Sequence, residues 1–305
     1  MEEISSSGYK DYVAGLLAGV AAVATGHPFD TVKVKMQKHN TEAHMIQYRS
    51  ALHCTARILK TEGIKGLYRG ATSSFVGMAV EGSLFFGFYS QTKLFLQGGM
   101  RSGEPRPQVI IPSAAFSGAI NSFVLCPTEL VKCRMQIQGT DSLVLKSTRY
   151  SSPLDCAIST VKTEGVKGIF RGGFTTLLRE SIGNAVFFSV YEYVRYHMHS
   201  HTKTASPNYS NLIDIGIGIV TGGLGGVAFW LTVLPLDVAK TLIQTNPDKS
   251  CSRNPFQVLS SVYRRAGLKG CYTGLAPTIS RAFPANAATI VTWELAMKML
   301  GIKHD

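Results

Sequence analysis

Three short stretches of the sequence place an acid, a lysine and a glutamine at fixed distances behind a proline. They read PFDTVKVKMQ from Pro28, PTELVKCRMQ from Pro127 and PLDVAKTLIQ from Pro235. In each stretch the acid is the second residue after the proline, the lysine the fifth and the glutamine the ninth. Charges inside an apolar segment are costly unless they are paired. We therefore expect the acids and lysines of different stretches to neutralise one another as ion pairs.

A second motif follows each stretch at a regular spacing. It reads EGIKGLYRG at 62–70, EGVKGIFRG at 164–172 and AGLKGCYTG at 266–274. Two motifs that recur three times in the same order indicate a chain built from three repeats.

Each repeat contains two long apolar segments, which must position these residues. The first of each pair covers about 10–38, 110–138 and 211–244, and the second about 72–97, 173–198 and 275–299. At a rise of ~1.5 Å per residue, a helix over any of them exceeds the ~30 Å hydrocarbon core of a bilayer. The sequence therefore predicts an all-α membrane protein with six transmembrane helices and both termini on one side.

The charge of the connecting segments indicates an orientation. The connections 39–70, 139–172 and 245–274 carry five Lys or Arg residues each, whereas 98–109 and 199–210 carry two and one. Basic connections stay on the side from which a membrane protein inserts.

The composition also excludes several classes of protein. A formal net charge of +12 implies an anionic neighbour, but the basic residues form no tract and six apolar spans argue against a nucleic-acid-binding protein. The six cysteines lack metal-site spacing, and the sequence contains no catalytic triad or phosphate-binding loop. We expect no metal, no cofactor and no enzymatic activity.

The two motifs resemble those of the mitochondrial carrier family, and the resemblance covers nearly the whole chain. It implies a six-helix barrel of three pseudo-symmetric repeats, here 8–98, 108–200 and 209–300, with short helices on the matrix side. It also implies a functional monomer in the mitochondrial inner membrane, with both termini toward the intermembrane space.

The resemblance assigns partners to the charges of the proline motifs. The implied pairs are Asp30 with Lys132, Glu129 with Lys240, and Asp237 with Lys33. The glutamines expected to brace this ring are Gln37, Gln136 and Gln244. Such a ring can act as a matrix gate that is closed when the pairs form; the alternative is a static ion-pair network.

A second gate is expected on the opposite, cytoplasmic side. The family motif [FY]-[DE]-x-x-[KR] is intact in YEYVR, whereas YSQTK has Ser90 for its acid and WELAMK has Met297 for its base. The pairs that can still form are Lys93 with Glu192 and Arg195 with Glu294, which predicts a weaker gate on this side.

The second motif resembles the cardiolipin-binding sites of the family, at helix N-termini whose N–H groups attract phosphate. The residues implied are Arg69, Gly70, Arg171 and Gly172. The third copy, YTG at 272–274, lacks the arginine.

Between the two gates, residues that break the threefold symmetry indicate a ligand site. Arg179 and Arg281 occupy equivalent positions within apolar segments, where the first repeat has Gly77. Glu180 adjoins Arg179, and Glu81 lies one turn after Gly77. Such charges are costly toward lipid, so we expect them to face a wet cavity; private salt bridges are the alternative. Adjacent residues project about 100° apart on a helix, which leaves the roles of Arg179 and Glu180 open.

This set of charges predicts the chemistry of the ligand. Arg281 suits a carboxylate, and Glu180 and Glu81 offer sites for two cations. The set resembles that of the family's carriers of basic amino acids (arginine, ornithine, lysine and histidine), which implies exchange by alternating access. His27, before the first proline, and Trp230 are further candidates for substrate contact. His27 can equally cap the gate, and Trp230 can stack on a cation or pack in a core.

Two other functions stay open. His27 lies in a stretch that is also similar to the carnitine/acylcarnitine carriers, whose ligand has a single cation and does not need Glu81. The chain can also be a membrane-embedded scaffold with vestigial carrier motifs.

Overall fold

The computed structural model describes residues 2–41, 48–96, 106–138, 150–202, 210–246 and 252–299, which are almost entirely α-helical and include no strand. In this part of the chain, six long helices alternate with shorter ones. The long helices are α1 (Glu2–Thr41), α4 (Ala71–Leu96), α5 (Pro107–Ile137), α8 (Gly173–Thr202), α9 (Ser210–Thr245) and α11 (Leu275–Met299). The shorter helices are α2 (Ala51–Glu62), α3 (Ile64–Leu67), α6 (Pro153–Glu164), α7 (Val166–Ile169) and α10 (Pro255–Cys271). The all-α prediction is confirmed.

The ends of the shorter helices follow from the second motif and from polar caps. The hydroxyl groups of Ser50 and Ser152 accept hydrogen bonds from the third main-chain N–H that follows, at the starts of α2 and α6. Gly63, Gly165 and Gly267 have φ angles of 67°, 74° and 62°, a left-handed conformation that favours glycine. This conformation ends α2 and α6 and kinks α10 at the equivalent point.

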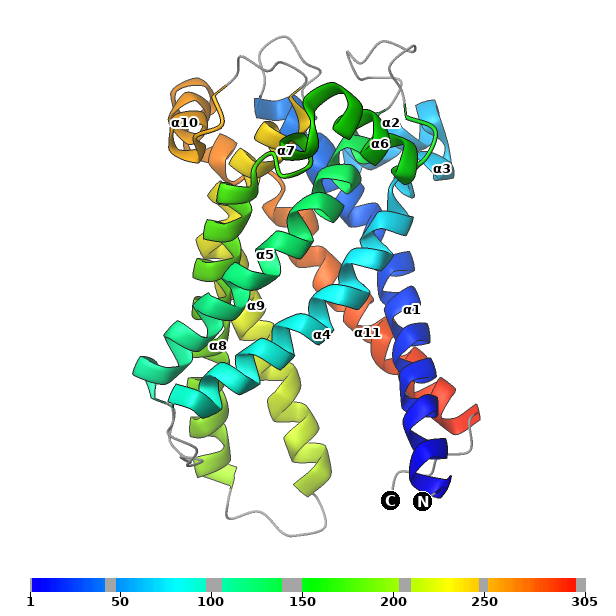
Figure 1. Cartoon of the computed structure of the whole chain (residues 1–305), viewed down its shortest axis with the longest axis vertical. Coiled ribbons are helices and arrows are strands. Elements are labelled where there is room, and N and C mark those ends of the chain that lie inside the picture. The colour runs from blue at the N-terminus through cyan, green and yellow to red at the C-terminus, as the bar shows by residue number, and fades with distance from the viewer. Residues whose placement is uncertain are drawn as a thin grey trace.

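The long helices contact one another in a ring. Contacts run from α1 to α4, α5, α8, α9 and α11 and back to α1, and the α1–α4 and α9–α11 contacts are the less extensive ones. The helices α1, α5 and α9 also contact one another. Figure 1 shows the shorter helices at one end of the molecule, the short-helix end, and both chain termini at the other, the terminal end.

The proline motifs lie where the long helices converge. Pro28, Pro127 and Pro235 lie inside α1, α5 and α9, and a proline inside a helix is a common cause of a bend. Their acids and lysines follow directly, toward the short-helix end.

Buried apolar side chains gather mainly where the shorter helices pack on the long ones. One such cluster joins Val238 and Leu242 of α9 to Val262 and Cys271 of α10. On the outer surface large apolar side chains are exposed, for example Phe123, which is 64% exposed. Within the described residues, Pro107–Ile137 and Gly216–Thr245 are long and apolar enough to cross a membrane.

Candidate functional site

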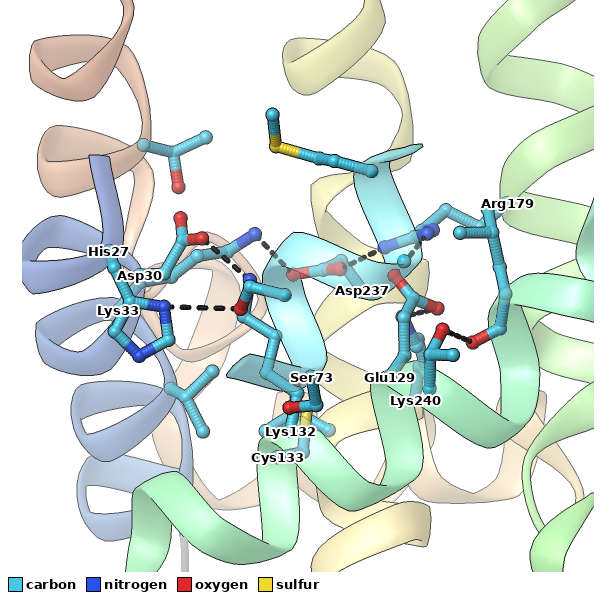
Figure 2. Close-up of a pocket in the computed structure, with 18 of the residues that line it drawn as sticks. His27, Asp30, Lys33, Ser73, Glu129, Lys132, Cys133, Arg179, Asp237 and Lys240 are labelled. Atoms are coloured by element: carbon cyan, nitrogen blue, oxygen red, sulfur yellow. Dashed lines mark hydrogen bonds and ion pairs between the residues drawn. The ribbon is translucent and has the colours of Figure 1, made fainter. Parts of the chain in front are cut away.

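A cavity of about 250 Å³ lies among the long helices at the level of the proline motifs. Every long helix contributes to its wall, from His27 and Asp30 of α1 to Thr278 and Arg281 of α11. Charged side chains from the proline motifs, α8 and α11 line it together with apolar ones, and Figure 2 shows several of the charged side chains pointing toward one another.

Ion pairs between the proline motifs line this cavity, and we call them the proline-motif pairs. Lys132 Nζ lies 2.6 Å from Asp30 Oδ2, Lys33 Nζ lies 2.7 Å from Asp237 Oδ2, and Lys240 pairs with Glu129. These are the partners expected from the sequence, and dashed lines in Figure 2 mark them. Several of the charges are almost fully buried; the side chain of Lys240 is 3% exposed. Because desolvation of a buried ion is expensive, each charge needs more than one partner.

The glutamines of the motifs differ from one another in their contacts. Gln37 Nε2 donates to Asp237 Oδ2 at 3.0 Å, and so braces an ion pair as expected. Gln136 Nε2 donates instead to the Thr31 hydroxyl group at 3.2 Å. Gln244 packs over Gly172, which has no Cβ. Of the three glutamines, Gln37 is thus the one with a hydrogen bond to an acid of the ring in the described residues.

The cavity arginines supply second cations to the acids of the proline motifs. Arg179 Nη1 donates to Asp237 Oδ1 at 2.9 Å, and its Nη2 donates to Glu129 Oε1 at 2.7 Å. Arg281 Nε lies 3.3 Å from Asp30 Oδ1. The residues predicted to bind substrate are therefore bonded directly to the residues predicted to form the gate. Sequence reasoning missed this link, because it treated the two sets as separate levels.

Arg179 and Glu180 both line the cavity, although they are adjacent on α8. A guanidinium group on a long side chain can turn back toward its neighbour, and Arg179 pairs with Glu180. Asn184, one turn later, donates to Glu180 Oε2 at 3.0 Å. A Cβ atom on Gly118 of α5 would lie 2.5 Å from the main-chain oxygen of Glu180, so glycine permits this close contact. Asn184 was not predicted.

The other cavity candidates are placed as follows. His27 is buried; its Nε2 lies 2.9 Å from the Arg69 main-chain oxygen, and its Nδ1 lies 3.1 Å from Ser74 Oγ. The Trp230 ring lies under Lys33, whose Nζ is 3.9 Å from the ring centroid, so the tryptophan stacks on a cation of the protein itself. The side chain of Glu81 lies outside the described residues, although Gly77 and Met78 just before it line the cavity.

Toward the terminal end, α4 and α8 are joined by another ion pair. Lys93 pairs with Glu192, and the Tyr89 hydroxyl group donates to the same carboxylate at 2.7 Å. Arg195 donates to the Tyr191 hydroxyl group at 3.1 Å. The side chain of Glu294, its expected partner, lies outside the described residues, as do those of Ser90 and Met297.

The arginines expected at lipid sites point toward protein acids. Arg69 Nη1 lies 3.2 Å from Glu62 Oε2, and Arg171, which is 2% exposed, lies 3.3 Å from Glu164 Oε2. The expected lipid sites at these helix N-termini stay a prediction. Gly70 and Gly172 keep the left-handed conformation, with φ of 81° each, directly before α4 and α8.

The same glutamates hold a second basic residue of the proline motif, which sequence reasoning also missed. Lys35 pairs with Glu62, and Arg134 Nη2 lies 2.6 Å from Glu164 Oε1. The equivalent residues of the third repeat are Leu242 and Ala266. This joint replacement of base and acid was a signal available in the sequence.

Known proteins resemble this chain over almost all of its length. The sequence profile of the mitochondrial carrier protein family matches residues 5–100, 107–202 and 213–304. The mitochondrial arginine transporter BAC1 of Arabidopsis thaliana is 68% identical over 297 residues, covering 97% of this chain and 96% of that protein. The mitochondrial basic amino acids transporter of Bos taurus is 35% identical over 284 residues, covering 92% and 89%. A mitochondrial carnitine/acylcarnitine carrier-like protein of Arabidopsis thaliana is 34% identical over 309 residues, covering 96% and 99%.

Proposed function

Because this chain belongs to the mitochondrial carrier protein family, we propose that it exchanges basic L-amino acids across the mitochondrial inner membrane by alternating access. The identity of 68% with an arginine transporter and of 35% with a basic amino acids transporter supports this class of substrate. The family membership supports transport, and we propose no enzymatic activity.

The proposed architecture is a transmembrane barrel of six helices in three repeats, 8–98, 108–200 and 209–300. The ring of contacts between the long helices and the exposed apolar side chains on its outer surface support this arrangement. The basic short-helix end would face the matrix and both termini the intermembrane space. We propose that the carrier works as a monomer and that cardiolipin contacts main-chain N–H groups after Gly70 and Gly172.

The cavity offers complementary groups to each part of a basic amino acid. Arg281 is 29% exposed in its side chain and would hold the carboxylate in a bidentate contact. Glu180 would take one cationic group, and Glu81 the other. His27 and Trp230 line the same cavity. Trp230 would accept the substrate cation on its ring when Lys33 leaves it.

One observation carries the mechanism: the arginines of the cavity bond to carboxylates of the proline-motif pairs. A substrate carboxylate on Arg281 competes with Asp30 for that guanidinium group. A substrate cation on Glu180 likewise competes with Arg179 and frees it to move. Binding would thus weaken the matrix gate, while Lys93–Glu192 and Arg195–Glu294 would form the opposite gate.

Counter-exchange in liposomes tests this function. Purified protein is reconstituted, the liposomes are loaded with unlabelled arginine, and uptake of labelled arginine is followed. We expect saturable uptake that ornithine, lysine and histidine inhibit and that ATP and malate do not. Arg281→Lys should raise the KM for arginine by about tenfold, because lysine cannot bind a carboxylate bidentately. Arg264→Lys, at an exposed position of α10, is the matched control.

The other outcomes of the assay identify the competing functions. Uptake driven only by nucleotides or dicarboxylates would overturn the substrate class, and no flux of any tested solute would favour a scaffold. Glu81→Gln should abolish arginine uptake. If the unmodified protein exchanges acylcarnitine and Glu81→Gln leaves that exchange intact, the chain is an acylcarnitine carrier.

A further inference from the structure

Each proline of the repeated motif leaves one main-chain carbonyl group without its usual helical partner. In an α-helix the N–H of a residue donates to the carbonyl group four residues earlier, and proline has no N–H. Pro28 and Pro235 therefore cannot satisfy the carbonyl groups of Ala24 and Leu231. Lipid supplies no water to replace the lost donor, so another group of the protein must do so.

Two tyrosine hydroxyl groups reach these carbonyl groups. Tyr68 Oη donates to the Ala24 oxygen at 2.8 Å, and Tyr272 Oη donates to the Leu231 oxygen at 3.2 Å. The tyrosines begin the YRG and YTG triplets of the first and third repeats. They are 40% and 37% exposed on the outer surface, so their hydroxyl groups serve the bent helices and not the cavity.

The second repeat differs at this position. Pro127 leaves the carbonyl group of Phe123 without a helical N–H, and the equivalent aromatic residue is Phe170, which has no hydroxyl group. Phe170 is 44% exposed, much as the two tyrosines are. The carbonyl groups freed by Pro28 and Pro235 thus each accept from an aromatic hydroxyl group, whereas the equivalent aromatic residue near Pro127 has no hydrogen to donate.

We propose that Tyr68 and Tyr272 are positioning residues that cap the carbonyl groups freed by Pro28 and Pro235. Each cap ties the bend of a long helix to the segment just after the short helices of the same repeat. The bend in α5 lacks this tie and is the most readily deformed of the three.

Two further contacts in the first repeat join the same segments. The Thr31 hydroxyl group donates to the Leu67 oxygen at 2.7 Å, and His27 Nε2 lies 2.9 Å from the Arg69 oxygen. Both residues flank Asp30, which follows Pro28 by two positions. The Tyr68 cap therefore helps to set the direction in which the charges of this motif point.

A double-mutant cycle on thermal stability in lipid nanodiscs tests the cap. Tyr68→Phe should lower the unfolding midpoint by about 2 to 4 °C. In a Pro28→Ala background the new N–H can bond the Ala24 carbonyl, so the same substitution should have no effect. An equal loss in both backgrounds would overturn the proposal. Tyr272→Phe with Pro235→Ala gives an independent cycle if Pro28→Ala does not fold.

The second repeat provides the converse test in an unmodified background. Phe170→Tyr should raise the midpoint by a similar amount, because it supplies the missing donor, and an unchanged or lower midpoint would contradict the proposal.

In exchange assays, which rest on the proposed function, Tyr68→Phe should lower the maximal rate and leave the KM for arginine unchanged. The stability cycles do not depend on transport, so they test the proposed tyrosine caps even if the protein does not exchange arginine.

Discussion

Arg179 Nη1 lies 2.9 Å from Asp237 Oδ1, while Lys33 Nζ lies 2.7 Å from Oδ2 of the same carboxylate. Each oxygen atom of one buried acid thus has its own cation, one from the cavity and one from the neighbouring proline motif. We therefore expect a ligand that displaces Arg179 in the cavity to act on the Lys33–Asp237 ion pair through this carboxylate.

Replacement of this shared acid should therefore cost more than the loss of one pair. Asp237→Asn leaves the buried Lys33 without its paired acid and removes one of the three carboxylates that Arg179 contacts, and we expect a loss of about 3 to 5 kcal/mol in stability together with loss of exchange. Chemical denaturation and counter-exchange measure both. The charge-swapped variant Lys33→Asp/Asp237→Lys restores the pair but turns a cation toward Arg179, so rescue should be partial. Full rescue would show that the contact between Arg179 and Asp237 contributes nothing to stability or exchange.

The contact between α5 and α8 should be sensitive to a single methyl group. Gly118→Ala places a Cβ atom 2.5 Å from the Glu180 oxygen, which must push α8 away and displace the Glu180 carboxylate. We expect lower stability, by about 1 to 3 kcal/mol, and a higher KM for arginine. Gly222→Ala is the matched control, because nothing lies within 4 Å of its added Cβ. Equal behaviour of the two variants would contradict the packing argument.

Glu164 should stabilise the folded state of the second repeat. Its Oε1 lies 2.6 Å from Arg134 Nη2 and its Oε2 lies 3.3 Å from Arg171 Nη1, so Glu164→Gln removes the negative charge that both buried arginines contact. We expect a loss of about 3 kcal/mol in unfolding free energy. Lys167→Gln, at an exposed position of α7, should change it little. The thermal midpoints of the two variants give the comparison.

The pair on the side of the chain termini should limit leakage. Glu192 accepts from both Lys93 and Tyr89, so Glu192→Gln removes the charge that joins α4 to α8 there. We expect unidirectional efflux of arginine to rise relative to exchange, because the cavity would close less firmly on that side. Tyr89→Phe, which keeps the charge, should have a smaller effect. A fall in exchange without a rise in efflux would argue against a gating role.

Cys156 should react slowly with alkylating reagents. The thiol lies on α6 and is fully buried against α5, and this burial raises its pKa from the usual 9.0 to about 11. Because the folded state favours the neutral thiol, its contribution to stability is present below pH 9 and is lost as the pH rises toward 11. Mass spectrometry after iodoacetamide treatment at pH 8 should find Cys156 labelled only after unfolding. Rapid labelling of the folded protein would contradict its burial.

The repeat pattern predicted the long helices, and threefold symmetry predicted that the charges of the proline motifs meet at one level around an axis. The resemblance to the family, and not the spacing of Asp30, Lys33 and their equivalents alone, implied which acid pairs with which lysine. The helices of the structure extend the predicted apolar segments by a few residues at several ends, for example α8 to Thr202. Helix ends depend on local caps, which hydropathy does not report.

The sequence did not predict contacts that depend on how far a long side chain reaches. A helical projection of α8 separates Arg179 from Glu180, yet the guanidinium group turns back and meets three carboxylates. The same reach brings Arg69 and Arg171 onto glutamates of their own repeats. Helical periodicity predicts the direction in which a side chain leaves the backbone, but it does not predict where the charged group of a long side chain lies.

The joint loss of base and acid in the third repeat, where Leu242 and Ala266 replace them, gives that third of the molecule a different dependence on temperature. As the temperature rises, the desolvation penalty of buried ion pairs falls, whereas stabilisation by apolar burial levels off. A heated carrier should therefore loosen first around α10, where the third repeat has apolar contacts in place of the buried ion pair.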